Sequence, residues 1–241
     1  MRASDNEELL DKILDLWRGL NSGEATLPSE PAIALATGAS RNSVREALIR
    51  LEERGYVHRT QGARTALNMR LAEVGNRVDR QIDHSVAIAR AGYEPGLRVV
   101  ESGVITLEAR PDRFDDLPDG TLALRTVKMW SADGVAYVVA EDIIPITDSA
   151  PPLDVETGQP VFDLAERLNG IGVAWETVWF TPVLVDSFAA RLLSLAEPTA
   201  GLQLVYCGLG ATDDVAYWSR EIQIAAPTRL RNALVRRVRR S

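Results

Sequence analysis

Apolar side chains recur every three or four residues near the start of the chain, which is the spacing of one helix face. They predict a helix over residues 5–19 that opens with the capping pattern Ser4-x-x-Glu7. The chain therefore begins with a helical domain.

Two further short helices follow, with a tight turn between them. Ser29 is placed to cap the first, and Pro31 lies just inside it, where its missing N–H costs nothing. Gly38 ends that helix, Ser40 caps the next, and Gly55 closes it. Two helices joined by a short turn containing glycine form a helix-turn-helix. Residues 56–60 and 65–68 then have strand character, which predicts a wing.

The start of the second helix of this motif carries polar side chains. In a helix-turn-helix, these first residues reach base edges in the major groove. Arginine can bind guanine with two hydrogen bonds, whereas Ser and Asn hold phosphates. The alternative is an amphipathic helix with a solvated basic face, but the polar residues lie where DNA binding needs them. The residues concerned are Arg41, Asn42, Ser43 and Arg45.

The run Leu27-Pro28-Ser29-Glu30, then Ser40-Arg41-x-Ser43-Val44-Arg45-Glu46-Ala47-Leu48, Leu51 and Gly55, closely resembles the winged-helix signature of the GntR family. The resemblance implies that Arg41 and Arg45 contact operator DNA and that Gln61-Gly62 is the wing tip. Pro31 and the wing sequence depart from the family pattern, so Arg64 is expected to compensate as a minor-groove or phosphate contact. The expected DNA-binding set is Ser29, Glu30, Ser40, Arg41, Asn42, Ser43, Arg45, Gln61, Gly62 and Arg64.

Beyond residue 95 the pattern changes from helical spacing to runs of β-branched and aromatic residues. Asp133-Gly134 is a hairpin turn signal. We expect a DNA-binding domain over 1–69, a helical connector over 70–95 and a second domain over 96–241, with a terminal helix from about 227. The second domain is predicted to contain strands at 99–107, 122–130, 135–145, 173–185, 202–209 and 215–224, and helices at 161–168 and 187–196.

A repeat links the two hairpins of this domain. Asp133-Gly-Val-Ala-Tyr137 recurs as Asp213-Asp-Val-Ala-Tyr217, and Glu141 matches Glu221 at the same offset of 80 residues. Either two related halves meet about a pseudo-twofold axis, or two ordinary strands coincide. Strand alternation puts Tyr137 and Glu141 on one face, and likewise Tyr217 and Glu221.

The second domain resembles the UTRA domain of the HutC branch of the GntR family, through the Leu124 to Gly134 hairpin, the Ala140-Glu141-x-x-Ile144-Pro145 ending and the Val161-Phe162-x-Leu164 helix. The resemblance implies an α+β, chorismate-lyase-like antiparallel sheet whose helices enclose a ligand cleft. Family members that bind phosphorylated sugars often carry paired basic residues here, where this chain has Arg125, Lys128 and Trp130. Cross-strand ion pairs are the alternative role for the expected effector-binding set, which is Arg125, Lys128, Tyr137, Glu141, Tyr217, Arg220 and Glu221.

The formal charge of −7 argues at first against nucleic acid. Residues 38–70, however, carry +4, against −4 before them and −7 after them. The basic charge thus falls on the predicted recognition helix and wing. An arginine-rich tail from residue 229 is interpreted as a solvated helix end, with a second DNA contact as the alternative.

One cysteine and two histidines exclude a disulfide framework and a metal cluster. No signal peptide and no apolar run of membrane-spanning length are present, so we expect a cytoplasmic protein. We also find no nucleophile elbow and no phosphate loop, which argues against catalysis.

We therefore expect a bacterial transcriptional regulator, most simply a repressor, that binds a palindromic operator as a homodimer and needs no cofactor. Its expected effector is a small anionic metabolite, of the carboxylate or phosphorylated-sugar class. Two alternatives stay open: a chorismate-lyase-like enzyme fused to a DNA-binding domain, and a DNA-binding protein whose second domain only dimerises.

Overall fold

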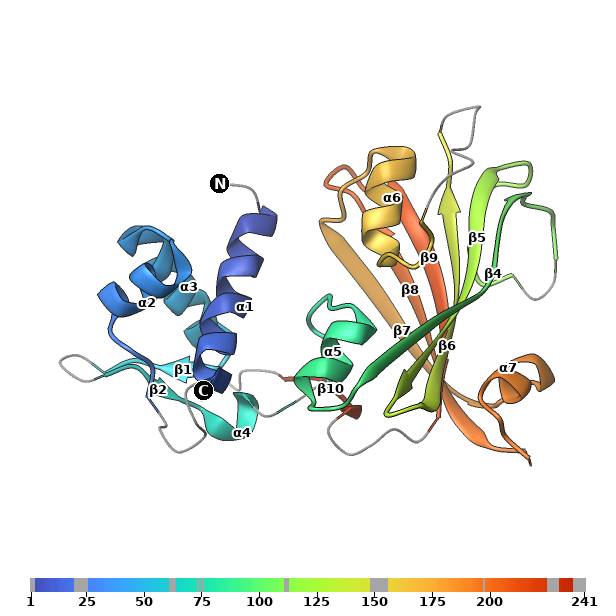
Figure 1. The fold of residues 1–241 in the computed structure, drawn as a ribbon. Helices are drawn as coiled ribbons and strands as arrows, with labels where there is room; N and C mark the ends of the chain where they lie inside the picture. Colours follow the sequence, from blue (N-terminus) through green and yellow to red (C-terminus); the bar gives the residue numbers. More distant parts are fainter. Residues whose placement is uncertain are drawn as a thin grey trace, which may run out of the picture. The chain divides into compact units, whose positions relative to one another are not determined.

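A computed structural model describes residues 3–19, 26–60, 64–72, 74, 76–110, 113–147, 156–196, 198–224 and 230–235. The chain divides into two compact units (Figure 1). The N-terminal unit contains residues 1–79 and 232–241, and the C-terminal unit contains residues 80–231.

Three helices build the core of the N-terminal unit: α1 (Ala3–Gly19), α2 (Glu30–Thr37) and α3 (Arg41–Glu53). Their apolar faces meet around side chains that are almost completely buried, among them Leu10, Ile33 and Leu48. These helices confirm the predicted helix-turn-helix with the helix before it.

The ends of these helices follow the sequence signals in all but one case. Gly38 and Gly55 have φ angles of +70° and +79°, the left-handed conformation that closes a helix. Ser40 caps α3, because its Oγ accepts a hydrogen bond from the backbone N–H of Ser43 at 3.1 Å. The predicted Ser4 cap is wrong, because α1 already begins at Ala3 and Ser4 lies within it.

The wing strands are short. β1 (Val57–His58) pairs antiparallel with β2 (Ala66–Leu67), as predicted. The expected wing tip, Gln61-Gly62, lies outside the described residues.

The residues after the wing are not one helix. They contain α4 (Met69–Ala72), β3 (Asn76–Arg77) and α5 (His84–Arg90) instead of a continuous helical connector. Asp83 starts α5 as its cap, with its carboxylate accepting from the backbone N–H of Ser85 at 2.8 Å. β3 pairs in parallel with β10 (Asn232–Ala233), so a strand occupies part of the expected terminal helix.

Arg77 anchors β3 within the N-terminal unit. Its side chain is 3% exposed and forms an ion pair with Asp79. It also donates to the carbonyl oxygen of Arg54 at 3.1 Å, and its guanidinium lies 4.5 Å from the centre of the Tyr56 ring. The last turn of α3 is therefore tied to the residues after the wing.

In the described residues, the C-terminal unit forms one six-stranded sheet with three α-helices, which confirms the predicted α+β fold. Every neighbouring pair in the order β4-β5-β6-β9-β8-β7 is antiparallel. Asp133 and Gly134 form the predicted two-residue turn, with φ angles of +50° and +79°. The strands are β4 (Pro95–Thr106), β5 (Leu122–Ala132), β6 (Val135–Pro145), β7 (Trp175–Leu184), β8 (Ala200–Leu209) and β9 (Val215–Gln223), and the remaining helices are α6 (Val161–Asn169) and α7 (Ser187–Leu192).

Helices cover both faces of this sheet (Figure 1). Ile88 of α5 packs with Val138 and Ala140, and Leu164 of α6 packs with Ile144. We call this side the α5/α6 face. On the opposite side, the α7 face, Ala189 and Leu193 pack with Val127, Val139 and Ile222.

Gly208 of β8 makes room for a side chain of the neighbouring strand. A Cβ at this position would lie 2.5 Å from Cε1 of Tyr217, which is 1% exposed. We expect Gly208→Ala to lower the free energy of unfolding by about 1–3 kcal/mol, because the buried ring has to shift. Chemical denaturation measures this effect. Gly103→Ala is the control, since a Cβ there meets nothing within 4 Å, and equal losses in both variants would contradict the prediction.

Candidate functional site

The start of α3 exposes the predicted recognition residues. Arg41, Asn42 and Arg45 are exposed, whereas Val44 and Leu48 on the opposite side of the helix are buried in the core. Burial of the apolar stripe thus fixes which side chains face outward. Ser40 and Ser43 stand together at the cap, with their hydroxyl oxygens 2.9 Å apart.

Beside this helix lies a hollow of about 780 Å³. Four of the predicted DNA-binding residues line it, although they come from α2, α3 and the segment before β2: Ser29, Glu30, Arg45 and Arg64. Ser29 holds the N-cap position of α2 as predicted, but its side chain makes no capping hydrogen bond. Its hydroxyl therefore does not cap the helix.

Glu30 belongs to the expected DNA-binding set, but its carboxylate is paired with an arginine of the same unit. Its carboxylate accepts from the guanidinium of Arg59 at 2.7 Å, and the backbone N–H of Arg59 donates to Glu52 at 3.1 Å. Glu30 therefore positions Arg59, a basic residue at the end of β1 that the candidate set leaves out. Arg59 lies in the basic stretch 38–70, and this position in the sequence could have identified it as a candidate.

The predicted effector residues divide between the two faces of the sheet. Arg125, Glu141 and Arg220 lie on the α7 face, and the remaining four lie on the α5/α6 face: Lys128, Tyr137, Tyr217 and Glu221. The cross-strand register explains this division, because Glu141 lies opposite Arg220 and Ala140 lies opposite Glu221. Arg125 and Lys128 therefore do not form one anion clamp.

The repeat does not place its matched residues Glu141 and Glu221 on one face, and the face expected for Tyr137 from strand alternation is wrong. Glu141 and Glu221 leave opposite faces, although the strand order β4-β5-β6 followed by β9-β8-β7 has the expected twofold pattern. Tyr137 does not share the face of Glu141 either, because a β-bulge between Trp130 and Ser131 leaves Tyr137 without a partner in the ladder. Its ring packs with Trp130 on the α5/α6 face.

On the α7 face, Glu141 lies between two arginines. Its carboxylate accepts from Nε of Arg125 at 2.6 Å and from the guanidinium of Arg220 at 2.5 Å. Arg125 also donates to Glu101 at 2.7 Å, and Arg220 lies over the Phe114 ring at 5.0 Å. A cleft of about 480 Å³, which we call the arginine cleft, is lined by these residues and by α7. Its two central arginines are thus partnered by carboxylates.

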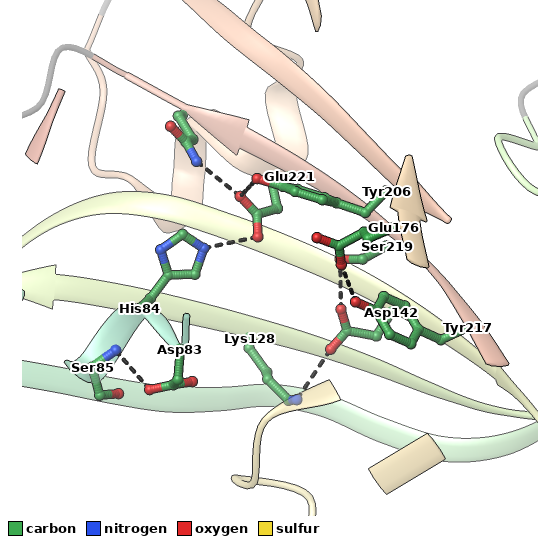
Figure 2. Close-up of polar contacts among 11 residues, drawn as sticks. Asp83, His84, Ser85, Lys128, Asp142, Glu176, Tyr206, Tyr217, Ser219 and Glu221 are labelled. Carbon is green, nitrogen blue, oxygen red and sulfur yellow. Dashed lines mark hydrogen bonds and ion pairs between the residues drawn. The ribbon is translucent and has the colours of Figure 1, made fainter. Parts of the chain in front are cut away.

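On the α5/α6 face, a network of polar groups extends across five strands and the start of α5 (Figure 2). We call it the carboxylate network, because Asp142, Glu176 and Glu221 are its centres. Glu221 accepts from Tyr206 and Gln223 and pairs with His84 at 2.8 Å.

The other two carboxylates are also hydrogen-bonded. Asp142 accepts from Thr126 and Ser219 at 3.0 and 2.7 Å and forms an ion pair with Lys128 at 3.1 Å. Glu176 accepts from the hydroxyl of Tyr217 (Figure 2). The same hydroxyl oxygen accepts from the side-chain amide of Gln81 at 3.2 Å.

Sequence reasoning missed three central members of this network. His84 fell in the expected connector, and neither Asp142 nor Glu176 belongs to a recognisable motif. Alternation could have pointed to Asp142, because it shares a strand face with Ala140 and Ile144, which are buried. A charged residue at an apolar position of a strand marks a partner or a ligand.

Burial changes the proton affinities within the network. It raises the pKa of Glu176, and hydrogen bonds from Tyr217 and Gln81 offset this only in part. Burial and the carboxylate of Glu176 together raise the pKa of Tyr217. The tyrosine hydroxyls of the network therefore stay protonated and act as donors to carboxylates.

The stability of the C-terminal unit should depend on the protonation of His84. Burial alone would lower the pKa of His84, but the carboxylates of Glu221, Asp83 and Asp142 outweigh it, so the pKa is raised above 6.5. Because the pKa of His84 is higher in the folded protein than in the unfolded chain, protonation of His84 stabilises the fold. This contribution is complete below the pKa of the unfolded chain and is lost as the pH rises through the pKa of the folded protein.

We therefore expect the melting temperature of this unit to fall as the pH rises above about 6.5, the value at which an unperturbed histidine titrates. His84→Gln should make that fall shallower, whereas His58→Gln, which changes the exposed histidine of the other unit, should not. Thermal melts followed by tryptophan fluorescence check this. An unchanged pH slope in His84→Gln would sink the prediction.

Among the described residues, no helix is long and apolar enough to cross a membrane. No group of three or more His, Cys, Asp or Glu in that part of the chain is placed to hold a metal ion.

Comparison with known proteins supports the folds described for both units. The sequence profile of the bacterial regulatory proteins of the gntR family matches residues 7–67. No match was found among curated proteins.

Two solved structures match almost the whole chain in fold. PhnF from Mycobacterium smegmatis is 20% identical with a TM-score of 0.55, and the match covers 94% of this chain and all of that one. YydK from Bacillus subtilis, described as a possible transcriptional regulator, is 11% identical with a TM-score of 0.66 over 97% of this chain and 99% of that one. The separate effector domain of PhnF is 17% identical with a TM-score of 0.53, covering 65% of this chain and 95% of that domain. The chain therefore carries a helix-turn-helix domain of the gntR family of bacterial regulatory proteins at residues 7–67, joined to a unit with the fold of the PhnF effector domain.

Proposed function

We propose that this chain is a ligand-responsive transcriptional repressor that binds a palindromic operator as a homodimer. The observation that carries the proposal is the exposed start of α3, where Arg41, Asn42 and Arg45 project from a gntR-type helix-turn-helix. Arginine can read guanine edges in the major groove, and asparagine can either read adenine edges or hold phosphates.

Symmetry supports the dimer and the palindrome. One helix-turn-helix reads about half of an operator, and two copies related by a twofold axis read half-sites one helical turn apart. We place the dimer contact in the C-terminal unit. Closed twofold dimers are the most common assemblies among soluble homo-oligomers.

We place the effector on the carboxylate network rather than in the arginine cleft. Burying charged groups costs free energy, and apolar residues of similar size would often stabilise the fold as well. A buried cluster of charged groups therefore favours a binding role over a purely structural one. The network lies between α5 and α6, with His84 and Glu221 keeping 13% and 9% of their side chains exposed. The effector domain of PhnF, which has the same fold, supports a ligand-binding role for this unit.

The effector would act through a difference in affinity. A ligand that binds the DNA-incompetent arrangement more tightly lowers operator affinity by that difference and by no more. The enzyme alternative predicts instead that a ligand is consumed. The alternative in which the second unit only dimerises predicts that no small molecule binds at all.

The experiment selects bound fragments from random DNA with the full-length protein, then footprints the selected site. A footprint of two symmetric half-sites, together with a dimer mass from light scattering, is the expected result. A monomer on a single half-site would overturn the proposed assembly, and absence of sequence preference would overturn the proposed regulator.

A further inference from the structure

The basic groups of the carboxylate network are already used. Lys128 is 1% exposed, and its Nζ lies 3.1 Å from Asp142 and 2.9 Å from the carbonyl oxygen of Gln159. In the described part of the chain, neither Glu176 nor Glu221 is paired with a lysine or arginine. Three carboxylates thus face one lysine and one histidine, which leaves the network with excess negative charge.

The end of α5 that faces this network adds to that charge. An exposed helix N-terminus attracts anions, but here the backbone N–H groups of Ser85 and Val86 already donate to the carboxylate of Asp83. An incoming phosphate would meet a fourth carboxylate where free N–H groups would otherwise be (Figure 2).

A second observation points to a bound molecule. Trp130 is 5% exposed, and its indole N–H is buried with no hydrogen-bond partner among the described residues. The ring lies on the same strand face as Lys128, with its centre 4.9 Å from that of His84. A buried donor without an acceptor is rare in folded proteins and calls for an explanation such as a ligand.

From these groups we infer that the effector is a small amine that also carries a hydrogen-bond acceptor, as amino alcohols and amino sugars do. Its ammonium group would donate to Glu221 and Glu176, and its acceptor would take the indole N–H of Trp130. The inference rests on the proposed function, because it names the ligand class of that same site. The amine class replaces the anionic class that the sequence favours, because carboxylates attract an ammonium group and repel a phosphate.

The test measures binding by isothermal titration calorimetry to the full-length protein, using matched probes. Glucosamine and ethanolamine represent the amine class, glucose and ethylene glycol are their hydroxyl counterparts, and glucose 6-phosphate, citrate and inorganic phosphate represent the anions. We expect an amine to bind at least about tenfold more tightly than its hydroxyl counterpart, as a charge-assisted hydrogen bond allows.

Variants then locate the site. Glu221→Gln and Glu176→Gln keep the shape of the side chain, remove its charge and should each weaken amine binding about tenfold. Glu141→Gln is the matched control, because Glu141 lies next to Ala140, the partner of Glu221, yet faces the arginine cleft. It should change amine affinity by less than about twofold, because its side chain points to the opposite face of the sheet. Thermal melts confirm that each variant is folded.

Each outcome decides one of the two proposals. Binding of an anion but of no amine overturns the amine class while leaving a ligand-responsive regulator in place. Amine binding that Glu141→Gln weakens and Glu221→Gln does not overturns the location. If the protein holds its selected operator and no probe of any class binds or changes that affinity, both the amine class and the proposed effector response fail, while the DNA-binding function stands.

Discussion

Replacing Arg41 by alanine should weaken operator binding by about 1–3 kcal/mol and relax the preference at one base position. Arg41 is the first residue of α3 and is exposed, and the Ser40 cap fixes the helix start from which it projects. Arg45, one turn further along, lines the hollow beside the helix and should give a similar loss. Fluorescence anisotropy on the selected operator and on its single-base variants measures both effects.

The form of the loss separates base contacts from phosphate contacts. If Arg41 contacts a base, the alanine variant will discriminate less than the original protein against operators changed at that base pair. If Arg41 contacts a phosphate, the variant will bind all sequences more weakly to the same extent, and the slope of log affinity against log salt will decrease by about one. Arg98→Ala, which removes the same charge from an exposed position on β4, is the control. If Arg98→Ala matched Arg41→Ala, net charge rather than the recognition helix would explain DNA binding.

Replacing Lys128 by methionine should destabilise the C-terminal unit by about 3–5 kcal/mol, because it leaves the buried carboxylate of Asp142 without its cation. Both side chains are almost fully buried, at 1% and 2% exposure, so solvent screens the pair little. Urea denaturation followed by tryptophan fluorescence reports on this unit, which contains four of the five tryptophans.

A double variant distinguishes the ion pair from simple packing. Lys128→Met combined with Asp142→Leu should recover part of the loss, since it removes both charges, but not all of it, because Thr126 and Ser219 lose their acceptor. Arg125→Ala, on the more exposed α7 face, should cost much less than Lys128→Met. A double variant no more stable than Lys128→Met would show that the charge of Asp142 is not what destabilises the fold.

The DNA-binding half of the molecule could be predicted because its signals are local. Gly38 and Gly55 end helices through their left-handed backbone conformation, and Ser40 begins α3 through its capping hydroxyl. The apolar stripe of α3 decides which residues face outward. The strands and the Asp133-Gly134 turn of the second unit were equally readable. Ser4 is the exception, because a capping pattern within a helix looks the same as one at its start.

The polar groups of the α5/α6 face could not be predicted together, because pairing between residues far apart in sequence determines which of them meet. His84 and Glu221 are 137 residues apart in sequence, and only the sheet order and the position of α5 bring them together. The bulge that turns Tyr137 away from the face of Glu141 adds one residue, and in a strand a shift of one residue reverses the face. Residue type alone therefore grouped charged residues of the α7 face with charged residues of the α5/α6 face.

The pairing of β3 with β10 has a consequence for how the protein is made. β10 lies at residues 232–233, after the entire C-terminal unit, yet it belongs to the N-terminal unit. During synthesis, the helix-turn-helix and wing leave the ribosome before the C-terminal unit, but their own unit stays incomplete until β10 has emerged. At 5–20 residues per second, the roughly 150 residues between β3 and β10 correspond to a delay of about 8–30 seconds. The nascent chain thus has time to form its sheet before the domain that reads DNA is completed.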